Sequence, residues 1–199
     1  MKYYVWLQYG GADQEPPDKV WTLEIDLCGM QVRDFKAGKQ FSSWDVNTSA
    51  IYSEEAPHAD YPFTIGLIPV HSSRLTALIH KECPDAVQYL PIRVKNRLTL
   101  HEIDGYSIAN YLKVIDCLDR EQADYEIWTK ANLLFWEKRP WLLGTFRTIN
   151  KFVLQSSRLT DDKVFWLWGW PMTIIREDIK TLIEQAAITG CRFHEIKTV

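Results

Sequence analysis

The sequence predicts a mixed α/β fold of the α+β class, in which a mostly antiparallel sheet packs against two similar helix–strand units to form a single domain over residues 1–199. Three observations predict this class. Strand-like segments recur along the chain, two amphipathic helices are each followed by another strand, and no low-complexity linker interrupts them. A chain of 199 residues can bury roughly 70% of its unfolded surface, so it needs neither a disulfide nor a metal to be stable.

The N-terminal third predicts two strands and a long loop. Residues 2–8 are rich in Tyr, Val and Trp and alternate weakly, which is typical of a strand. Residues 20–27 alternate between apolar odd positions and mainly polar even positions, as in a strand that is covered on one face. Residues 36–60 are rich in Ser, Asp, Glu, Gly and Ala without periodicity, so we expect a loop with at most short elements there.

The most informative internal signal is a similarity between residues 72–92 and 176–196, which align without a gap at an offset of 104 residues. Both segments carry the i, i+3, i+4 stripe of an amphipathic helix and then a strand-like stretch. The aligned apolar pairs are Leu75 with Ile179, Leu78 with Leu182, Ile79 with Ile183, Tyr89 with Phe193, and Ile92 with Ile196. The pattern predicts two similar helix–strand units. Because amphipathic helices resemble one another for physical reasons, it leaves open whether they arose by duplication.

Further strands are predicted between the two units. Residues 106–118 are too apolar for a surface helix and are rich in Ile, Val and Tyr, which favours a buried strand. Polar breaks separate three more candidates, which are residues 125–129, 149–154 and 164–168. Asp161 and Asp162 stand between the last two, where they indicate a hairpin turn.

Charge and hydropathy exclude several classes of function. The chain has 23 basic and 26 acidic side chains, and its net charge of −3 gives no basic field for a nucleic-acid backbone. No apolar window is long enough to cross a membrane, and the apolar stretch at the N-terminus is too short for a signal peptide. The spacing of the 4 cysteines fits no zinc or redox motif, so we expect free, buried thiols in the cytoplasm.

The motifs of common enzyme classes are missing from the sequence. There is no G-x-S-x-G elbow, and Gly38-Lys39 lacks the remaining residues of a P-loop. Neither His80 nor His101 has a His or Cys partner at metal-ligand spacing. We therefore expect no catalytic residues, no cofactor and no metal.

Two segments could carry an interaction. Carboxylates are dense between residues 116 and 126, as in a solvated turn, a pair of catalytic or cation-binding carboxylates, or an acidic patch for a basic protein. In a strand, Trp166, Trp168 and Trp170 would share one face, which is either buried or a stacking platform. The residues predicted to contact a partner are carboxylates of the two turns and one indole, namely Asp119, Glu121, Asp124, Asp161, Asp162 and Trp168.

Five segments, in this order and spacing, resemble the bacterial immunity proteins of polymorphic-toxin and contact-dependent competition systems, a subset of which was formerly described as a domain of unknown function. The segments are DYP at 60–62, IPVHSSRL at 68–75, DAVQYLPI at 85–92, IANYLKVIDCLD at 108–119 and ITGCRFHEI at 188–196. The resemblance spans roughly residues 60–199. It implies a cytoplasmic, non-enzymatic protein that binds a cognate toxin protein and covers or distorts the active site of that toxin.

The leading hypothesis is therefore an immunity protein that is a monomer or homodimer when free and binds neither nucleic acid nor membrane. The alternative is a small hydrolase or glycan-processing enzyme that uses carboxylates near Asp116 to Asp124 and the tryptophan row. A third hypothesis is a scaffold protein. Two carboxylates converging in a deep cleft beside exposed indoles would favour the enzyme, and a shallow surface with buried tryptophans would favour the binding protein.

Overall fold

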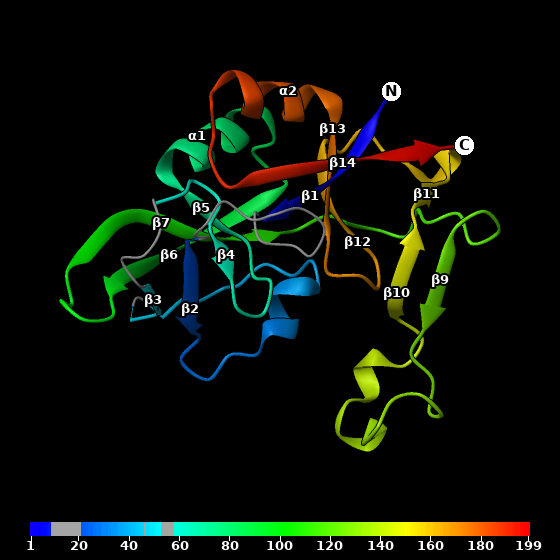
Figure 1. Ribbon diagram of the computed structural model, residues 1–199, viewed down its shortest axis with the longest axis horizontal. Helices are drawn as coiled ribbons and strands as arrows, with labels where there is room; N and C mark the ends of the chain where they lie inside the picture. The colour runs from blue at the N-terminus through cyan, green and yellow to red at the C-terminus, as the bar shows by residue number, and fades with distance from the viewer. Residues whose placement is uncertain (9–20, 46, 53–57) are drawn as a thin grey trace.

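The computed structural model describes residues 1–8, 21–45, 47–52 and 58–199, which form two six-stranded sheets, a two-stranded hairpin and two α-helices (Figure 1). The first sheet has the strand order β11 (Val153–Leu154), β14 (Cys191–Thr198), β1 (Tyr3–Gln8), β13 (Thr173–Arg176), β12 (Val164–Leu167) and β8 (Val114–Ile115). The second has the order β4 (Phe63–Thr64), β2 (Thr22–Asp26), β3 (Ser49–Tyr52), β6 (Val87–Asn96), β7 (Glu102–Tyr111) and β5 (Val70–Ser72). The hairpin consists of β9 (Asp124–Ile127) and β10 (Phe146–Lys151). Most pairings in this part of the chain are antiparallel, which confirms the predicted α+β class.

The two predicted helix–strand units are present and share one geometry. In one unit α1 (Ser73–Glu82) connects β5 to β6, and in the other α2 (Glu177–Gln185) connects β13 to β14. Both helices, and both strands that follow them, begin at positions 104 residues apart. In each unit an antiparallel strand lies between the two connected strands, β7 in the first and β1 in the second. Both are therefore split β-α-β units.

The strand registers of the two units also agree. Tyr106 in β7 pairs with Ser72 on one side and with Ile92 on the other. Tyr3 in β1 pairs with Arg176 and Ile196, which are the residues 104 positions after Ser72 and Ile92. The similarity therefore extends from the sequence pattern to hydrogen-bonded pairing across three strands.

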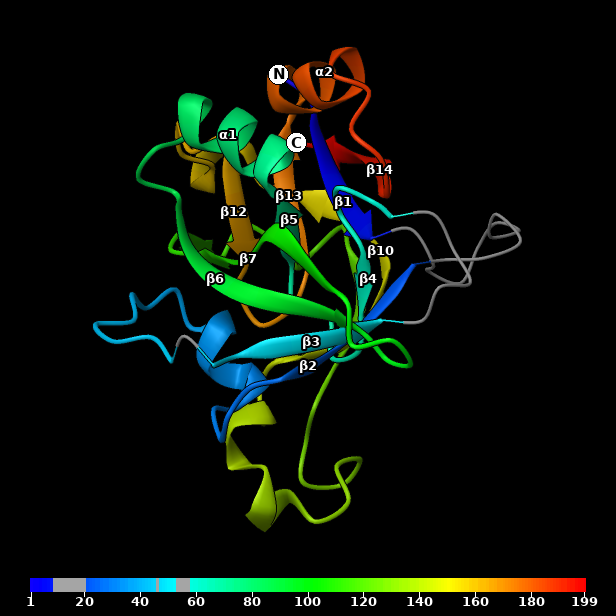
Figure 2. The ribbon, with the colours of Figure 1, turned by 90° about the vertical axis from the view of Figure 1, so that its left-hand side faces the viewer.

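The helices lie next to each other over one core (Figure 2). Leu75 and Ile79 of α1 and Ile179 and Ile183 of α2 are buried, as the stripe predicts. The Ser72 side chain caps α1 by accepting a hydrogen bond from the backbone N–H of Leu75 at 3.3 Å. Burial of these stripes against both sheets is what fixes the helices in place.

Aromatic rings fill the space beneath the helices. Trp6 lies 4.7 Å from Tyr61 and 5.3 Å from His71 between ring centroids, and Tyr111 lies 5.4 Å from Trp166. The His71 Nε2 atom is 3.1 Å from the Tyr111 hydroxyl, and burial lowers the pKa of His71 to about 3. The imidazole is thus a neutral part of the core.

Five of the predicted strands are confirmed, with shifted ends. Residues 2–8 form β1, 20–27 contain β2, 125–129 contain most of β9, and 164–168 contain β12, while 149–154 are divided between β10 and β11. Val20 lies outside the described residues. The Cys83 and Cys117 thiols are buried as predicted, and burial raises the pKa of Cys83 to about 11. Cys28, in contrast, is exposed.

The described part of residues 36–60, expected to be a loop with at most short elements, contains the four-residue strand β3, which is held by pairing with β2 and β6. Two local predictions are wrong. The single strand predicted over 106–118 breaks after Tyr111, because β7 belongs to the second sheet and β8 to the first. Asp161 and Asp162 do not form a hairpin turn, since β11 pairs with β14 whereas β12 pairs with β13 and β8.

In the part of the chain that the structure describes, neither helix has the length and apolar character needed to span a membrane.

Candidate partner-binding surface

The β9–β10 hairpin is attached to the body through a close contact with the turn that follows β12. The Phe146 N–H donates to the carbonyl of Gly169 at 3.0 Å. Gly169 has a φ of +71°, and a Cβ there would lie 3.3 Å from the Phe146 ring, so glycine suits both the turn and the contact. Trp168, 41% exposed, packs edge-on against Phe146 at 6.3 Å.

The predicted Trp168 and the acidic turn lie together. The Arg120 guanidinium lies 5.8 Å from the centroid of the Trp168 ring and donates to both carboxylate oxygens of Asp116 at 2.9 Å. Arg158 reaches the same carboxylate at 3.8 Å. The Asp116 carboxylate is therefore paired with two guanidinium groups. The other carboxylates predicted in this turn are Asp119, Glu121 and Asp124.

The three predicted carboxylates of this turn have different surroundings. Asp119 shapes it, because its Oδ1 atom accepts from the backbone N–H groups of Glu121 at 3.0 Å and Gln122 at 2.9 Å. Glu121 is exposed, and Asp124 is exposed and accepts from the Asn150 amide at 3.3 Å. The turn thus presents two accessible carboxylates beside an indole.

The structure does not bring Asp161 and Asp162 to this turn. They precede β12, whereas Trp168 follows it, so the two groups lie at opposite ends of that strand. Asp162 accepts a hydrogen bond from the Thr160 hydroxyl at 2.8 Å, and the Asp161 carbonyl accepts from Arg176 at 3.4 Å.

The predicted common face of the tryptophan row is wrong. Trp166 is only 2% exposed and belongs to the core beneath the helices, while Trp170 packs half-buried against a different core on the other side of the sheet. The alternation fails because β12 ends at Leu167 and the chain then turns through Gly169. Only Trp168 of this row is exposed.

A projecting segment, of which the strand predicted over 125–129 covers only residues 128 and 129, follows β9. Residues 128–144, here called the arm, connect β9 to β10 and extend away from the body (Figure 1). Large apolar side chains are exposed on it: Leu134 is 81% exposed, Phe135 70% and Trp141 46%. The signal in the sequence is the two apolar runs LLFW at 133–136 and WLL at 141–143, which lie between strands and not within them. Such exposure is typical of an interaction site.

The carboxylates of the turn lie apart from the pockets of the described surface. Within the described ranges no group of three or more His, Cys, Asp and Glu residues could hold a metal ion. Two pockets, of about 490 and 300 Å³, lie beside α1 and beside Trp6, and none of the carboxylates of residues 116–126 lines either of them. Of the tryptophans in the row, Trp166 is buried as expected for a binding protein, whereas Trp168 is exposed.

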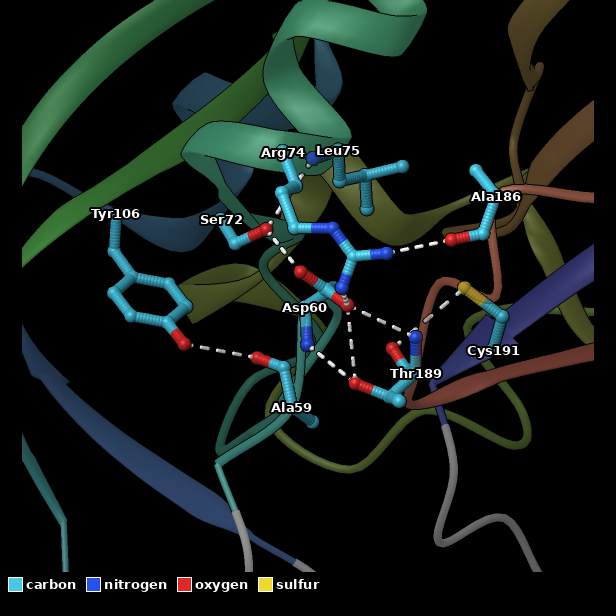
Figure 3. A network of polar contacts seen from close by, with 9 residues as sticks. All are labelled: Ala59, Asp60, Ser72, Arg74, Leu75, Tyr106, Ala186, Thr189 and Cys191. Carbon is cyan, nitrogen blue, oxygen red and sulfur yellow. Dashed lines mark hydrogen bonds and ion pairs between the residues drawn. The ribbon is translucent and has the colours of Figure 1, made fainter. Parts of the chain in front are cut away.

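Three segments that carry the family resemblance meet in a partly buried polar network (Figure 3). Asp60 of the DYP segment accepts from the Ser72 hydroxyl at 2.6 Å and from the Thr189 N–H at 3.1 Å. Arg74 adds an ion pair at 3.3 Å and also donates to the carbonyl of Ala186 after α2. The network therefore joins the first split unit to the second, and we call it the clasp.

Glycine is required at the clasp. Gly190 has a φ of +82°, and a Cβ there would lie 2.3 Å from the carbonyl oxygen of Tyr61. The Tyr61 N–H donates to the carbonyl of the adjacent Thr189 at 3.0 Å. These segments of the resemblance therefore build the scaffold and leave the exposed surface to other parts of the chain.

The described residues thus define an α+β protein built on two split β-α-β units. Comparison with known families places it further: the model of the immunity protein family Imm11 matches residues 19–198. The chain belongs to the Imm11 family, and the match includes most of the N-terminal third, beyond the resemblance over 60–199. No curated protein matches the chain.

Proposed function

We propose that this protein binds a cognate toxin polypeptide in the cytoplasm and neutralises it without catalysis, so that the producing cell and its kin survive. Membership of the immunity protein family Imm11 carries the proposal. The exposed indole and carboxylates beside the β9–β10 hairpin support it, because Trp and charged side chains on a rigid support are common at protein interfaces.

The proposed contact surface contains Trp168, Glu121 and Asp124, with Asp119 holding the turn in shape. Glu121 and Asp124 would face basic groups of the toxin and steer its association. Asp161 and Asp162 belong to the same proposal as a second acidic contact. A partner footprint of about 800 Å² is about 30 Å across, and the four residues of β12 extend only about 13 Å, so one footprint can include both ends of that strand.

Co-expression with the toxin domain that we expect to be encoded beside this gene tests the function. We expect rescue of growth and co-purification of a complex that contains both chains. Failure of both with that toxin would contradict the proposal.

Charge reversal tests the surface. We expect the pair E121K and D124K to slow association with the toxin by about tenfold or more at low salt, with the difference shrinking as salt is added. D104K is the matched control, because Asp104 is an exposed carboxylate on β7, away from the hairpin. Equal association rates for E121K, D124K and D104K would show that the contact lies elsewhere on the protein.

A further inference from the structure

We infer that the arm, residues 128–144, is the element of this protein that enters the toxin, and that it fits an apolar pocket whose rim carries carboxylates. This inference rests on the proposed function and specifies its contact. The rigidity of the arm, the conformation of its exposed phenylalanine and the charge around that side chain support it.

The arm is held in place before any partner arrives. The Gly144 N–H donates to the carbonyl of Trp128, and the Trp128 N–H to the carbonyl of Thr145, both at 2.9 Å, which closes its base. The Asn132 side chain accepts from the Thr129 N–H at 2.7 Å and donates to the carbonyl of Ile127 at 3.0 Å. A preorganised element loses less conformational entropy on binding than a mobile one.

Contacts further out on the arm add to this order. Leu133 is buried, although its neighbour Leu134 is 81% exposed. The Arg33 guanidinium, from the 3₁₀ helix η1 (Val32–Lys36), lies 4.1 Å from the ring centroid of Trp141. Figure 2 shows this short helix directly above the arm. The arm is therefore fixed at its base and along one side.

Phe135 stands out within the arm. Its side chain is 70% exposed, and its φ of +57° lies in the left-handed region that bulky side chains rarely adopt. Neither burial nor the backbone conformation favours phenylalanine at this position, and glycine would fit the same turn. Backbone strain of this kind is characteristic of binding sites, where the surrounding structure holds a side chain in position for a ligand.

The charge around the apolar side chains indicates the chemistry of the pocket. The arm contains three cationic residues, Lys130, Lys138 and Arg139, and only one acidic residue, Glu137. The Lys138 ammonium lies 5.6 Å from the centroid of the Phe135 ring. A toxin pocket that accepts the Phe135 ring therefore has the Lys138 ammonium at its edge. Carboxylates on the rim of that pocket would form ion pairs with this ammonium.

The arm is also continuous with the proposed contact surface. It follows Ile127 at the end of β9 and leads into β10 at Phe146, which lies beside Trp168, while Asp124 and the acidic turn lie at the other end of this four-residue strand. A toxin bound against Trp168 and Glu121 would thus lie next to the arm. One interface can include both.

The test compares F135G with L100G in binding to the toxin domain against which this protein rescues growth in the co-expression test. Leu100 is a matched control, because it is also 70% exposed, has a φ of +59° and lies in the β6–β7 turn. We expect F135G to raise the Kd at least about 30-fold, as for an interface hot spot, and L100G to change it less than about twofold. Both variants should keep the wild-type Tm within about 2 °C, since glycine accepts the left-handed conformation.

A charge reversal tests the rim. We expect K138E to weaken toxin binding by about tenfold and to reduce its salt dependence. K113E, at an exposed lysine outside the arm, should do neither.

The outcomes separate the inference from the proposed function. Wild-type protein that neither binds nor rescues would overturn both. Wild-type protein that binds, with F135G binding as tightly, would overturn the inference alone. Dimers of the free protein that F135G dissociates without changing toxin affinity would show that the arm contacts a second copy of this chain, which also overturns the inference.

Discussion

Replacing Gly190 by alanine should strongly destabilise the protein, because this position joins the two split units at the clasp. An added Cβ would lie 2.3 Å from the carbonyl oxygen of Tyr61 and 3.0 Å from the Cβ of Ala59. The Tyr61 N–H is bound to the carbonyl of Thr189, one residue before the glycine. The two backbone segments must separate before alanine can fit.

The expected cost follows from these contacts. A residue with a Cβ costs about 1–2 kcal/mol at the φ of +82° that Gly190 adopts. Ordinary van der Waals contact begins at 3.4 Å, so the segments must move apart by about 1 Å. That shift breaks the Tyr61–Thr189 hydrogen bond and weakens those of Asp60, at about 1 kcal/mol or more each. The sum is about 3–5 kcal/mol, or a Tm lower by about 6–20 °C.

Gly144→Ala is the matched control for this measurement. Gly144 has a φ of +81°, but nothing lies within 4 Å of the position that its Cβ would take. We expect this variant to lose only the conformational share, about 1–2 kcal/mol. Urea and thermal unfolding of both variants would give the difference, and equal losses would refute the argument that close approach between the two units requires glycine.

Three further predictions concern the buried imidazole of His71, the carboxylate of Asp60 in the clasp and the guanidinium of Arg33 beside the arm. The pKa of His71 is lowered from 6.5 to about 3. The stability that comes from burying the neutral imidazole is therefore complete above about pH 6.5 and is lost as the pH falls towards 3, by up to about 5 kcal/mol. Urea midpoints at about pH 7.5 and about pH 4.5 would show this loss, and H71Q should show a shallower pH dependence. Asp60→Ala should cost about 2–3 kcal/mol, because it removes the acceptor of the buried Ser72 hydroxyl and of the Thr189 N–H, whereas Arg74→Ala should cost less than about 1 kcal/mol because its side chain is 59% exposed. Arg33→Ala removes about 0.5–1 kcal/mol of interaction with Trp141 and should speed hydrogen exchange in the arm while lowering the Tm by only about 1–4 °C.

The parts of the fold that the sequence predicts well are those with local causes. The i, i+3, i+4 stripe is a property of each helix alone, so α1 and α2 and the strands after them are found at the predicted places. The shared register of the two units could not be predicted, because β7 and β1 occupy different positions in the order of the chain. Only the structure shows that Tyr106 and Tyr3 are equivalent.

The features that the sequence does not predict depend on pairing between distant residues. An apolar run cannot indicate that it changes from one sheet to another, as the chain does between β7 and β8. The short β3 has no pattern of its own and is a strand because β2 and β6 flank it. Of the proposed contact surface, Trp168 and the carboxylates near it stand out in the sequence by their residue type. The arm does not, because an apolar run in a sequence normally indicates burial, and only the structure shows that Leu134, Phe135 and Trp141 are exposed.

The division between scaffold and surface leads to a last prediction, an exchange of arms. The segments that carry the family resemblance include DYP at 60–62 and ITGCRFHEI at 188–196, which build the clasp. The arm lies outside all five segments, and backbone hydrogen bonds between Trp128 and the residues Gly144 and Thr145 close its base. Residues 129–143 can therefore be replaced by the corresponding segment of another Imm11 protein without disturbing the clasp.

We expect such a chimera to keep the wild-type Tm within about 4 °C and to bind the toxin of the arm's donor at least about tenfold more tightly than the parent does. The physical reason is that specificity is a difference of affinities, which depends on the side chains that enter the partner and not on the scaffold that holds them. Calorimetric titration of both toxins into both proteins gives the four affinities. A chimera that folds and still prefers the original toxin would show that the turn with Glu121 and Trp168, and not the arm, determines which toxin is bound.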